Sequence, residues 1–212
     1  MVQQRLLDIA VREFSLKGLE GASTREIAAA AGTVMSSITY HYGGKEGLYL
    51  AAADHIAEQM RQGMVESVAH AIDIVDPSPA EARLALHDIL ASFVDKMIDE
   101  RTASWSLFIV REQMNPTEAF DRIWSGMMGR MMERVVALVC IASGHRDTRA
   151  PRAAAITLLG QVIVLRASRA SCLKLLQTRD FGAADVSAIK ARVAANIDDI
   201  LDTLTAERQE PQ

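Results

Sequence analysis

Apolar residues recur at intervals of three and four along the first stretch of the chain. Within residues 2–17 they stand at Leu7, Ala10, Val11 and Phe14. This spacing places them on one face of an α-helix, so the stretch is predicted to be helical with that face buried. We expect Gly18 to end the helix, because glycine is unfavourable within a helix and common just after one.

A second helix is indicated by its start and stop signals. Ser23 and Glu26 have the spacing of a capping box, in which the Ser23 hydroxyl accepts from the Glu26 amide and the Glu26 carboxylate accepts from the Ser23 amide. The helix therefore begins at Thr24. It continues through a run of alanines and ends at Gly32, since glycine readily adopts the left-handed conformation of a tight turn.

A third short helix is predicted at roughly Val34–Tyr42, before two consecutive glycines. Its spacing from the second helix is that of a helix-turn-helix unit, with Ala28 where the helices cross, Gly32 in the turn and Ile38 on the buried side. The residues that this arrangement turns away from the core are Met35, Ser36, Ser37, Thr39 and Tyr40. A short, exposed helix of this kind suits the major groove of DNA.

Helical patterns continue to the end of the chain. Prolines, glycines and capping residues divide the rest into further predicted helices, at roughly residues 45–72, 79–100, 103–114, 115–142, 151–176 and 184–206. The predicted fold class is all-α, with about nine helices in total. It consists of an N-terminal three-helix helix-turn-helix domain in residues 1–50 and a larger C-terminal helical bundle in residues 51–212.

Composition supports this fold class and indicates the setting. Hydrophobic residues make up 50% of the chain and aromatic residues 5%, whereas sheet proteins favour aromatic and β-branched residues. No uninterrupted apolar run approaches the ~18 residues of a membrane span, and Arg5 and Asp8 interrupt any apolar signal segment. We expect a cytoplasmic protein without membrane contact. We expect Cys140 and Cys172 to be buried free thiols, with a redox role as the alternative.

The third predicted helix carries hydrogen-bonding groups but little charge. Its hydroxyl-bearing side chains can bond to base edges, and a methionine or threonine methyl can contact the methyl group of thymine. Arg25, at the start of the second helix, can reach a guanine or a phosphate. The side chains suited to phosphates are Tyr40, His41 and Lys45. The whole chain has a formal net charge of −4, but residues 34–44 contain no acidic residue.

Four segments of about the first 55 residues carry a specific pattern: Ser23–Ala28, Ala31–Gly32, Ile38–Tyr42 and Lys45–Tyr49. Together they resemble the DNA-binding domain of the TetR family of bacterial transcriptional regulators. The resemblance implies base or phosphate contacts from Thr24, Arg25, Met35, Ser36, Ser37, Thr39, Tyr40, His41 and Lys45.

The chain departs from the family pattern at two positions. Thr39 stands where a tyrosine is usual, which leaves Tyr40 and Tyr42 as the available phosphate-contacting aromatics. Val34 stands where a polar cap often precedes the third helix, which leaves Thr33 as a candidate cap.

Further segments are similar to one branch of that family. They are Thr39–Leu50, Arg111–Gln113 ahead of Asn115–Thr117, and Ile197–Leu201. These resemble the CecR-like (YbiH-like) branch, which implies control of efflux or drug-sensitivity genes. The function that we expect is a sequence-specific, ligand-released repressor that binds a double-stranded, palindromic operator as a homodimer.

The segment Pro151–Leu176 is apolar nearly all round, which is more than one core face requires. Together with apolar positions in residues 184–206 it suggests a two-fold, four-helix interface between subunits. In a dimer, two reading helices about one DNA turn apart would read a palindrome. The alternative is that the segment is the buried central helix of a monomer.

A stripe of methionines with a tryptophan one turn earlier lies on the helix predicted at residues 115–142. Such a stripe is either ordinary core packing or the wall of a pocket for an apolar or aromatic effector of unknown identity. The candidate ligand-binding residues are Phe93, Met97, Trp105, Phe108, Arg111, Trp124, Met127, Met128 and Met131. Arg111 would pair either with an acidic group of the effector or with a glutamate in a structural salt bridge.

The sequence does not indicate catalysis. Its five histidines are scattered without metal-ligand spacing, and there is no glycine-rich phosphate loop. We therefore expect no enzyme, no metal site and no cofactor. The alternative to a DNA-binding regulator is a helical protein-interaction scaffold without sequence-specific DNA binding, which leaves the first domain unexplained.

Overall fold

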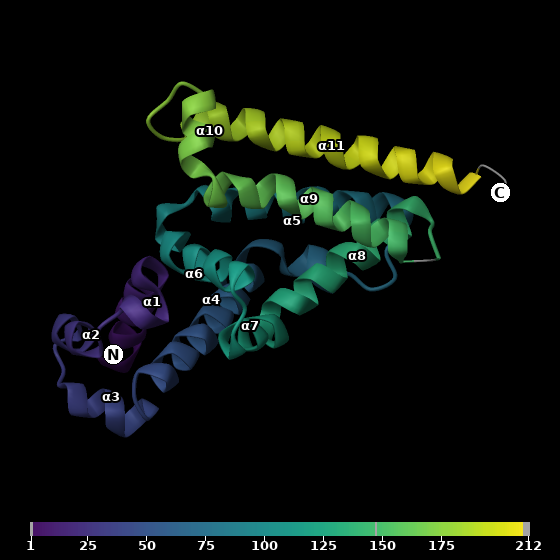
Figure 1. Ribbon diagram of the computed structural model, residues 1–212. Coiled ribbons are helices and arrows are strands. Elements are labelled where there is room, and N and C mark those ends of the chain that lie inside the picture. The colour runs from purple at the N-terminus through teal and green to yellow at the C-terminus, as the bar shows by residue number, and fades with distance from the viewer. Residues whose placement is uncertain (1, 147, 210–212) are drawn as a thin grey trace. The chain divides into compact units, whose positions relative to one another are not determined.

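The computed structural model describes residues 2–146 and 148–209, and these ranges are helical with no β-strand (Figure 1). The prediction of an all-α fold is therefore confirmed. The chain folds as two compact units. Unit 1 comprises Met1–Gly63 and Glu100–Arg130, and unit 2 comprises Met64–Asp99 and Met131–Gln212. Unit 1 thus contains the predicted helix-turn-helix segment together with a segment from the middle of the chain.

Unit 1 is built from the N-terminal helices and the middle segment. Its elements are α1 (Val2–Gly21), α2 (Thr24–Ala31), α3 (Met35–Tyr42), the first part of α4 (Lys45–Asp73), a 3₁₀ turn (Glu100–Thr102), α6 (Ala103–Met114), α7 (Glu118–Ile123) and a π turn (Trp124–Met128). α1 packs on both α2 and α6. Phe14, Ile56 and Phe108 are fully buried, so both chain segments contribute to one core.

Unit 2 is a bundle of longer helices. Its elements are the rest of α4, α5 (Pro79–Ile98), most of α8 (Gly129–Ser143), α9 (Arg149–Ala167), α10 (Arg169–Leu175) and α11 (Ala183–Gln209). α5, α9 and α11 each pack against the other two. Leu86, Leu158 and Ile197, one from each of these helices, are fully buried at the centre of the bundle.

The predicted start of α2 is confirmed, although only half of its capping box forms. The Ser23 hydroxyl accepts from the Glu26 amide, and Gly32 ends the helix with a φ of 72°. The Glu26 carboxylate bonds to the Lys17 ammonium at 2.9 Å, so it is used between helices and not at the cap. α3 begins after Val34 without any side-chain cap, so the candidate cap at Thr33 was wrong.

α1 is longer than predicted. Gly18 has non-helical angles (φ 72°, ψ 177°), yet helical structure resumes and continues to Gly21. The glycine therefore kinks α1 and does not end it. A Cβ at Gly18 would lie 3.1 Å from Nη1 of Arg111, so the side chain of this α6 residue lies against the kink.

The single helix predicted for residues 115–142 was wrong. The structure has α7, a π turn and α8 there, and the cap of α7 is Thr117, not Asn115. Within the π turn, Gly126 has a ψ of −105°. A Cβ at this glycine would lie 2.8 Å from the Cβ of Ala57 in α4. The turn thus lies where two distant segments approach closely, which helical periodicity does not reveal.

The helix predicted at residues 151–176 is divided in two. Ser168 has non-helical angles (φ −123°, ψ 33°) between α9 and α10. Its carbonyl accepts from the amides of Ser171 and Cys172, which starts the new helix. Cys172 and Cys140 are not joined in a disulfide, as predicted, but each is half-buried and not fully buried.

By its length and composition alone, α9 could cross a membrane. This differs from our expectation that the chain contains no such segment. Its inner face, which includes Ala155, Leu158 and Val162, is buried in unit 2, where α9 packs on α5 and α11. The central helix of a water-soluble bundle has the same length and apolar content. Burial within unit 2 therefore accounts for the composition of this face.

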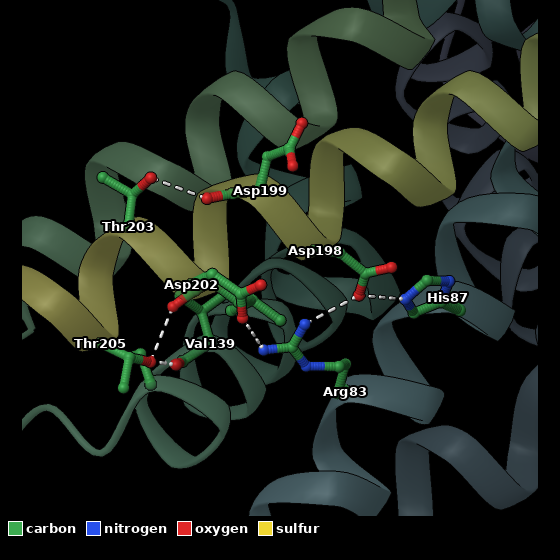
Figure 2. A network of polar contacts seen from close by, with 10 residues as sticks. Arg83, His87, Val139, Asp198, Asp199, Asp202, Thr203 and Thr205 are labelled. Carbon is green, nitrogen blue, oxygen red and sulfur yellow. Dashed lines mark hydrogen bonds and ion pairs between the residues drawn. The ribbon is translucent and has the colours of Figure 1, made fainter.

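A polar network joins α5 to α11 within unit 2 (Figure 2). Arg83 donates to Asp198 at 2.9 Å and also to Asp202, while Nε2 of His87 lies 3.0 Å from the same oxygen of Asp198. Hydrogen bonding to His87, and then to Arg83, holds the pKa of Asp198 below its usual value. Because these groups are partly exposed, the network adds little unfolding free energy. It nevertheless links defined turns of the two helices.

Candidate nucleic-acid interface

α2 and α3 cross at small and aliphatic side chains. Ala28 is 2% exposed and Ile38 is 1% exposed. Gly32 makes the turn between the helices, and the Thr33 amide donates to the Ala28 carbonyl at 2.9 Å. The structural roles predicted for the alanine, the glycine and the isoleucine are confirmed. The two helices form a helix-turn-helix unit.

α3 presents a row of exposed side chains on the side away from this crossing. Tyr40 is 85% exposed and Met35 is 52% exposed. The other candidate contacts on α3 are Ser36, Thr39 and His41, which are exposed, and Ser37, which is half-buried. The rings of Tyr40 and His41 meet edge to face with centroids 5.0 Å apart. The surface of unit 1 therefore carries the predicted contact residues of α3, with Ser37 only partly accessible.

The first turn of α2 adds one exposed cation to the surface of unit 1. Arg25 is exposed, while Thr24 is half-buried. The adjacent carboxylate of Glu26 is paired with Lys17, whose ammonium also bonds to Glu13 at 2.8 Å. Hydrogen bonds to Glu13 and Glu26 raise the pKa of Lys17 to about 12. The negative charge of Glu26 is thus balanced by Lys17 of α1.

Lys45 has a structural contact as well as a candidate role. Its Nζ donates to the carbonyl of Glu20 at 2.8 Å, which joins the start of α4 to the end of α1. An ammonium group has three donors, so this bond leaves capacity for a phosphate. The half-buried position of Lys45 next to the turn after α3 is compatible with such a contact.

His55 is buried between α1 and α4. Its Nε2 lies 2.7 Å from Oδ1 of Asp8, and Gln59 donates to the same oxygen at 3.2 Å. This cluster holds the two helices that support the helix-turn-helix unit. The side chain of His70 lies outside the described residues. Among the residues that are described, no group of histidine, cysteine and carboxylate side chains has an arrangement suited to a metal ion.

A buried carboxylate links α4 to α6 and α7. Glu112 is 2% exposed, and it accepts from the Tyr49 hydroxyl at 2.6 Å and from the amide and hydroxyl of Thr117 at 3.0 and 2.9 Å. The Tyr49 ring lies against Phe14 and Phe108, with centroids 4.9 and 4.7 Å away. Burial, and then the bond to Glu112, raises the pKa of the Tyr49 hydroxyl. Four helices of unit 1 meet at this cluster.

Arg111 binds the backbone at the kink of α1. Its Nε donates to the Ser15 carbonyl at 3.3 Å and its Nη2 to the Leu16 carbonyl at 3.1 Å. These carbonyls precede Gly18, where the regular helical bonding of α1 is interrupted. The guanidinium therefore satisfies backbone acceptors that the kink leaves free. The sequence had suggested only an acidic group of the effector or a glutamate as the partner of Arg111.

The other candidate ligand-binding residues of unit 1 differ in accessibility. Phe108 is fully buried and Met128 is 5% exposed, whereas Trp124 is 43% exposed and stacks on Phe120 with centroids 6.0 Å apart. Trp105 and Met127 are half-buried. The π turn breaks the predicted methionine stripe, because it changes the angular spacing along the helix.

The remaining candidate ligand-binding residues belong to unit 2. Met97 of α5 and Met131 of α8 are 5% and 6% exposed, and Phe93 is half-buried. Met97 and Met131 are thus packed as core residues of that unit.

Sequence reasoning missed two features of unit 1. Val34 is 63% exposed at the start of α3, whereas the sequence pattern indicated only that a polar cap is missing there. The buried role of Glu112 was also missed. One signal was available, since Glu112 stands four residues after Phe108 and thus on the same face of α6.

Two family models match the chain. Residues 6–52 match the model described as bacterial regulatory proteins, tetR family. Residues 82–204 match the C-terminal domain of the HTH-type transcriptional dual regulator CecR. The second match alone covers more than half of the chain.

Similar proteins of known description are also regulators. The chain is 29% identical to the HTH-type transcriptional dual regulator CecR of Shigella flexneri over 213 residues, which is 96% of this chain and 92% of that protein. It is 28% identical to the HTH-type transcriptional regulatory protein RaaS of Mycobacterium tuberculosis over 151 residues, which is 71% of this chain and 63% of that protein.

Solved structures share the fold. AibR in complex with isovaleryl coenzyme A and operator DNA superposes with a TM-score of 0.69 at 17% identity, covering 92% of this chain and 97% of AibR. SCO4454, a TetR-family transcriptional regulator from Streptomyces coelicolor, superposes with a TM-score of 0.66 at 20% identity, covering 96% of both chains. With its helix-turn-helix unit and these matches, the chain belongs to the TetR family of transcriptional regulators, with a CecR-type C-terminal domain, and it is a DNA-binding regulator and not an enzyme.

Proposed function

We propose that this regulator is a repressor that binds a palindromic operator as a homodimer and is released by a small-molecule effector. The observation that carries the proposal is the exposed face of α3, which is supported from below by Ala28 and Ile38 and contains no acidic residue. In this proposal residues 1–50 read DNA, and residues 51–212 bind the effector and form the dimer. The protein then works in the cytoplasm, where its operator lies.

The proposed base contacts are tested by removing two hydroxyls from α3. The double change Ser37→Ala with Thr39→Ala is expected to reduce the preference for the selected site over random DNA by roughly 5- to 150-fold, since each hydrogen bond contributes about 0.5–1.5 kcal/mol. The site is obtained by selection from a pool of random duplexes, and the preference is measured by fluorescence anisotropy. Circular dichroism should remain helical.

A matched control removes one serine and one threonine hydroxyl elsewhere. Ser125→Ala with Thr203→Ala changes two exposed residues whose hydroxyls bond to carbonyls of their own helices. This control should keep the full preference. An unchanged preference in the α3 variant would contradict the proposed reading face, and failure to select any site would contradict sequence-specific binding itself.

The proposed dimer rests on the outer face of α9. Small and apolar residues are exposed there at helical spacing, namely Ala153, Ile156, Gly160, Val164 and Ala167. A similar exposed row on α11 consists of Ala184, Ala188 and Ala191. Such rows permit close approach of helices from a second copy. The inner face of α9 is buried in the single chain, as the alternative from the sequence expected, and the proposal assigns only the exposed outer face to a partner.

Placing a charge on this face is expected to separate the subunits. Ile156 is 72% exposed in the single chain, so Ile156→Glu leaves the monomer fold intact. Burying an unpaired carboxylate in the interface should weaken the dimer by roughly 100-fold. Sedimentation equilibrium measures the change. Leu84→Glu, at a 65% exposed position on α5, is the control and should stay dimeric. Equal dimer strength in both variants would contradict the assignment.

We also propose that the effector is apolar or aromatic and that the regulated genes concern efflux or drug sensitivity. The proposal of an apolar or aromatic effector is supported by the accessible aromatic and methionine side chains of unit 1, namely Trp105, Trp124 and Met127. Phe108 and Arg111 support it less, because one is fully buried and the other bonds to α1. The CecR-type C-terminal domain supports the proposal that the regulated genes concern efflux or drug sensitivity.

A further inference from the structure

Two apolar side chains stand exposed at the first turn of α3. Val34 is 63% exposed and Met35 is 52% exposed. Single exposed apolar residues are common on protein surfaces. These two are consecutive, and they lie at the N-terminal end of the second helix of a helix-turn-helix unit, which is the end that contacts base edges.

Val34 occupies a position where another residue would stabilise the helix better. It is the N-cap of α3, with extended angles (φ −104°, ψ 149°) and no side-chain hydrogen bond to the helix. Ser23 caps α2 in the usual way, whereas valine is among the poorest N-cap residues. The intrinsic stability of α3 therefore does not account for valine at this position.

α3 also lacks the side chains that distinguish bases by paired hydrogen bonds. Its sequence from Met35 to Tyr42 contains no arginine, lysine, asparagine or glutamine. The hydroxyls of serine and threonine can bond to several base edges, so they discriminate weakly. For α3 itself, apart from Arg25 of α2, the remaining base-specific chemistry in the major groove is the contact between an apolar group and the C5 methyl of thymine.

We propose that Val34 and Met35 read thymine methyl groups, so that one or two thymines in each operator half-site are recognised by apolar contact at the first turn of α3. This inference rests on the proposed function, since it concerns the same surface on the same DNA.

Deoxyuridine provides a direct test, because it pairs as thymidine does but lacks the methyl group. In a site selected from random duplexes, each thymine is replaced in turn by uracil, and binding is measured by fluorescence anisotropy. At the contacted positions the affinity is expected to fall about fourfold for each methyl removed. Other thymines in the site should tolerate the replacement.

The protein side of the test uses the double change Val34→Ala with Met35→Ala. In this variant the thymine and uracil duplexes should bind equally, because the contacting side chains are gone. Tyr40→Phe is the matched control on α3. It should weaken binding to both duplexes by the same factor and keep the fourfold difference between them. If the double variant does not fold, Val34→Ser with Met35→Gln provides the comparison, since serine is a favoured N-cap residue and glutamine keeps the length of the side chain while replacing its apolar end.

The outcomes separate the two proposals. A selected site in which uracil is tolerated at every position overturns the thymine assignment and leaves operator binding intact. A uracil effect that persists in the double alanine variant, or in Val34→Ser with Met35→Gln where that variant replaces it, also overturns the assignment, because other residues then make the contact. If selection yields no enriched sequence, the proposed function fails, and the thymine assignment fails with it.

Discussion

Replacing Gly47 with alanine is expected to disrupt the connection between α3 and α4 and to abolish DNA binding. A Cβ at this position would lie 1.7 Å from the carbonyl oxygen of Tyr42, the last residue of α3. That oxygen belongs to the backbone, so no side-chain rotation relieves the overlap. We expect a loss of about 3 kcal/mol or more of unfolding free energy. Chemical denaturation followed by circular dichroism measures the loss of unfolding free energy, and fluorescence anisotropy measures the loss of DNA binding.

Gly160→Ala is the matched control for this glycine. No atom of the same chain lies within 4 Å of a Cβ built at Gly160. The residue lies inside α9, on the face proposed for the dimer, where the exposed row already contains alanines such as Ala153. Alanine is favoured over glycine within a helix by about 1 kcal/mol, so the control should be unchanged or slightly more stable. Equal stability of the two variants would show that α3 and α4 can separate without loss, and it would contradict the geometry of this turn.

Replacing Glu112 with alanine is expected to have the second largest effect. The change leaves three buried or partly buried donors without their acceptor, namely the Tyr49 hydroxyl and the amide and hydroxyl of Thr117. Each unsatisfied donor costs about 1–3 kcal/mol when buried, so a total of about 3 kcal/mol is expected. Hydrogen exchange of α4 and α6, together with denaturation, should show the loss within unit 1.

Glu118→Ala is the control for the carboxylate. Glu118 is an exposed residue that pairs with Arg122 along α7, and its removal should leave the unfolding free energy nearly unchanged. If Glu118→Ala and Glu112→Ala destabilise the protein equally, burial of the Glu112 cluster does not stabilise unit 1.

The same cluster predicts how stability changes at high pH. The pKa of Tyr49 is raised in the folded state above its ordinary value of 10.0. The folded protein therefore retains the proton that the unfolded chain loses, and this contribution to stability is complete below pH 10 and declines as the pH rises above it. Tyr49→Phe should therefore make the unfolding free energy fall less steeply above pH 10. Denaturation at several alkaline pH values measures this difference.

Local signals in the sequence were enough to predict the reading unit. Ser23 and Gly32 define α2 through contacts within a few residues, and the buried positions of Ala28 and Ile38 follow from helical spacing. The exposed row on α3 then follows from geometry, because residues opposite a buried face point outward.

Long-range contacts could not be predicted in the same way. Arg111 was a candidate for ligand binding, but it bonds to Ser15, which lies 96 residues earlier in the chain. Glu112 bonds to Tyr49 across 63 residues. Polar side chains on a helix have many possible partners, and sequence spacing does not select among residues so far apart.

The sequence by itself determined that this protein is all-α, that it carries a helix-turn-helix unit, and which side chains of α3 face outward. These features depend on interactions within one or two helical turns. Tertiary structure decided that residues 100–130 join the N-terminal helices in unit 1, that Gly126 passes against Ala57, and that α9 divides from α10. Packing between segments far apart in the chain produces these features, and no local preference encodes it.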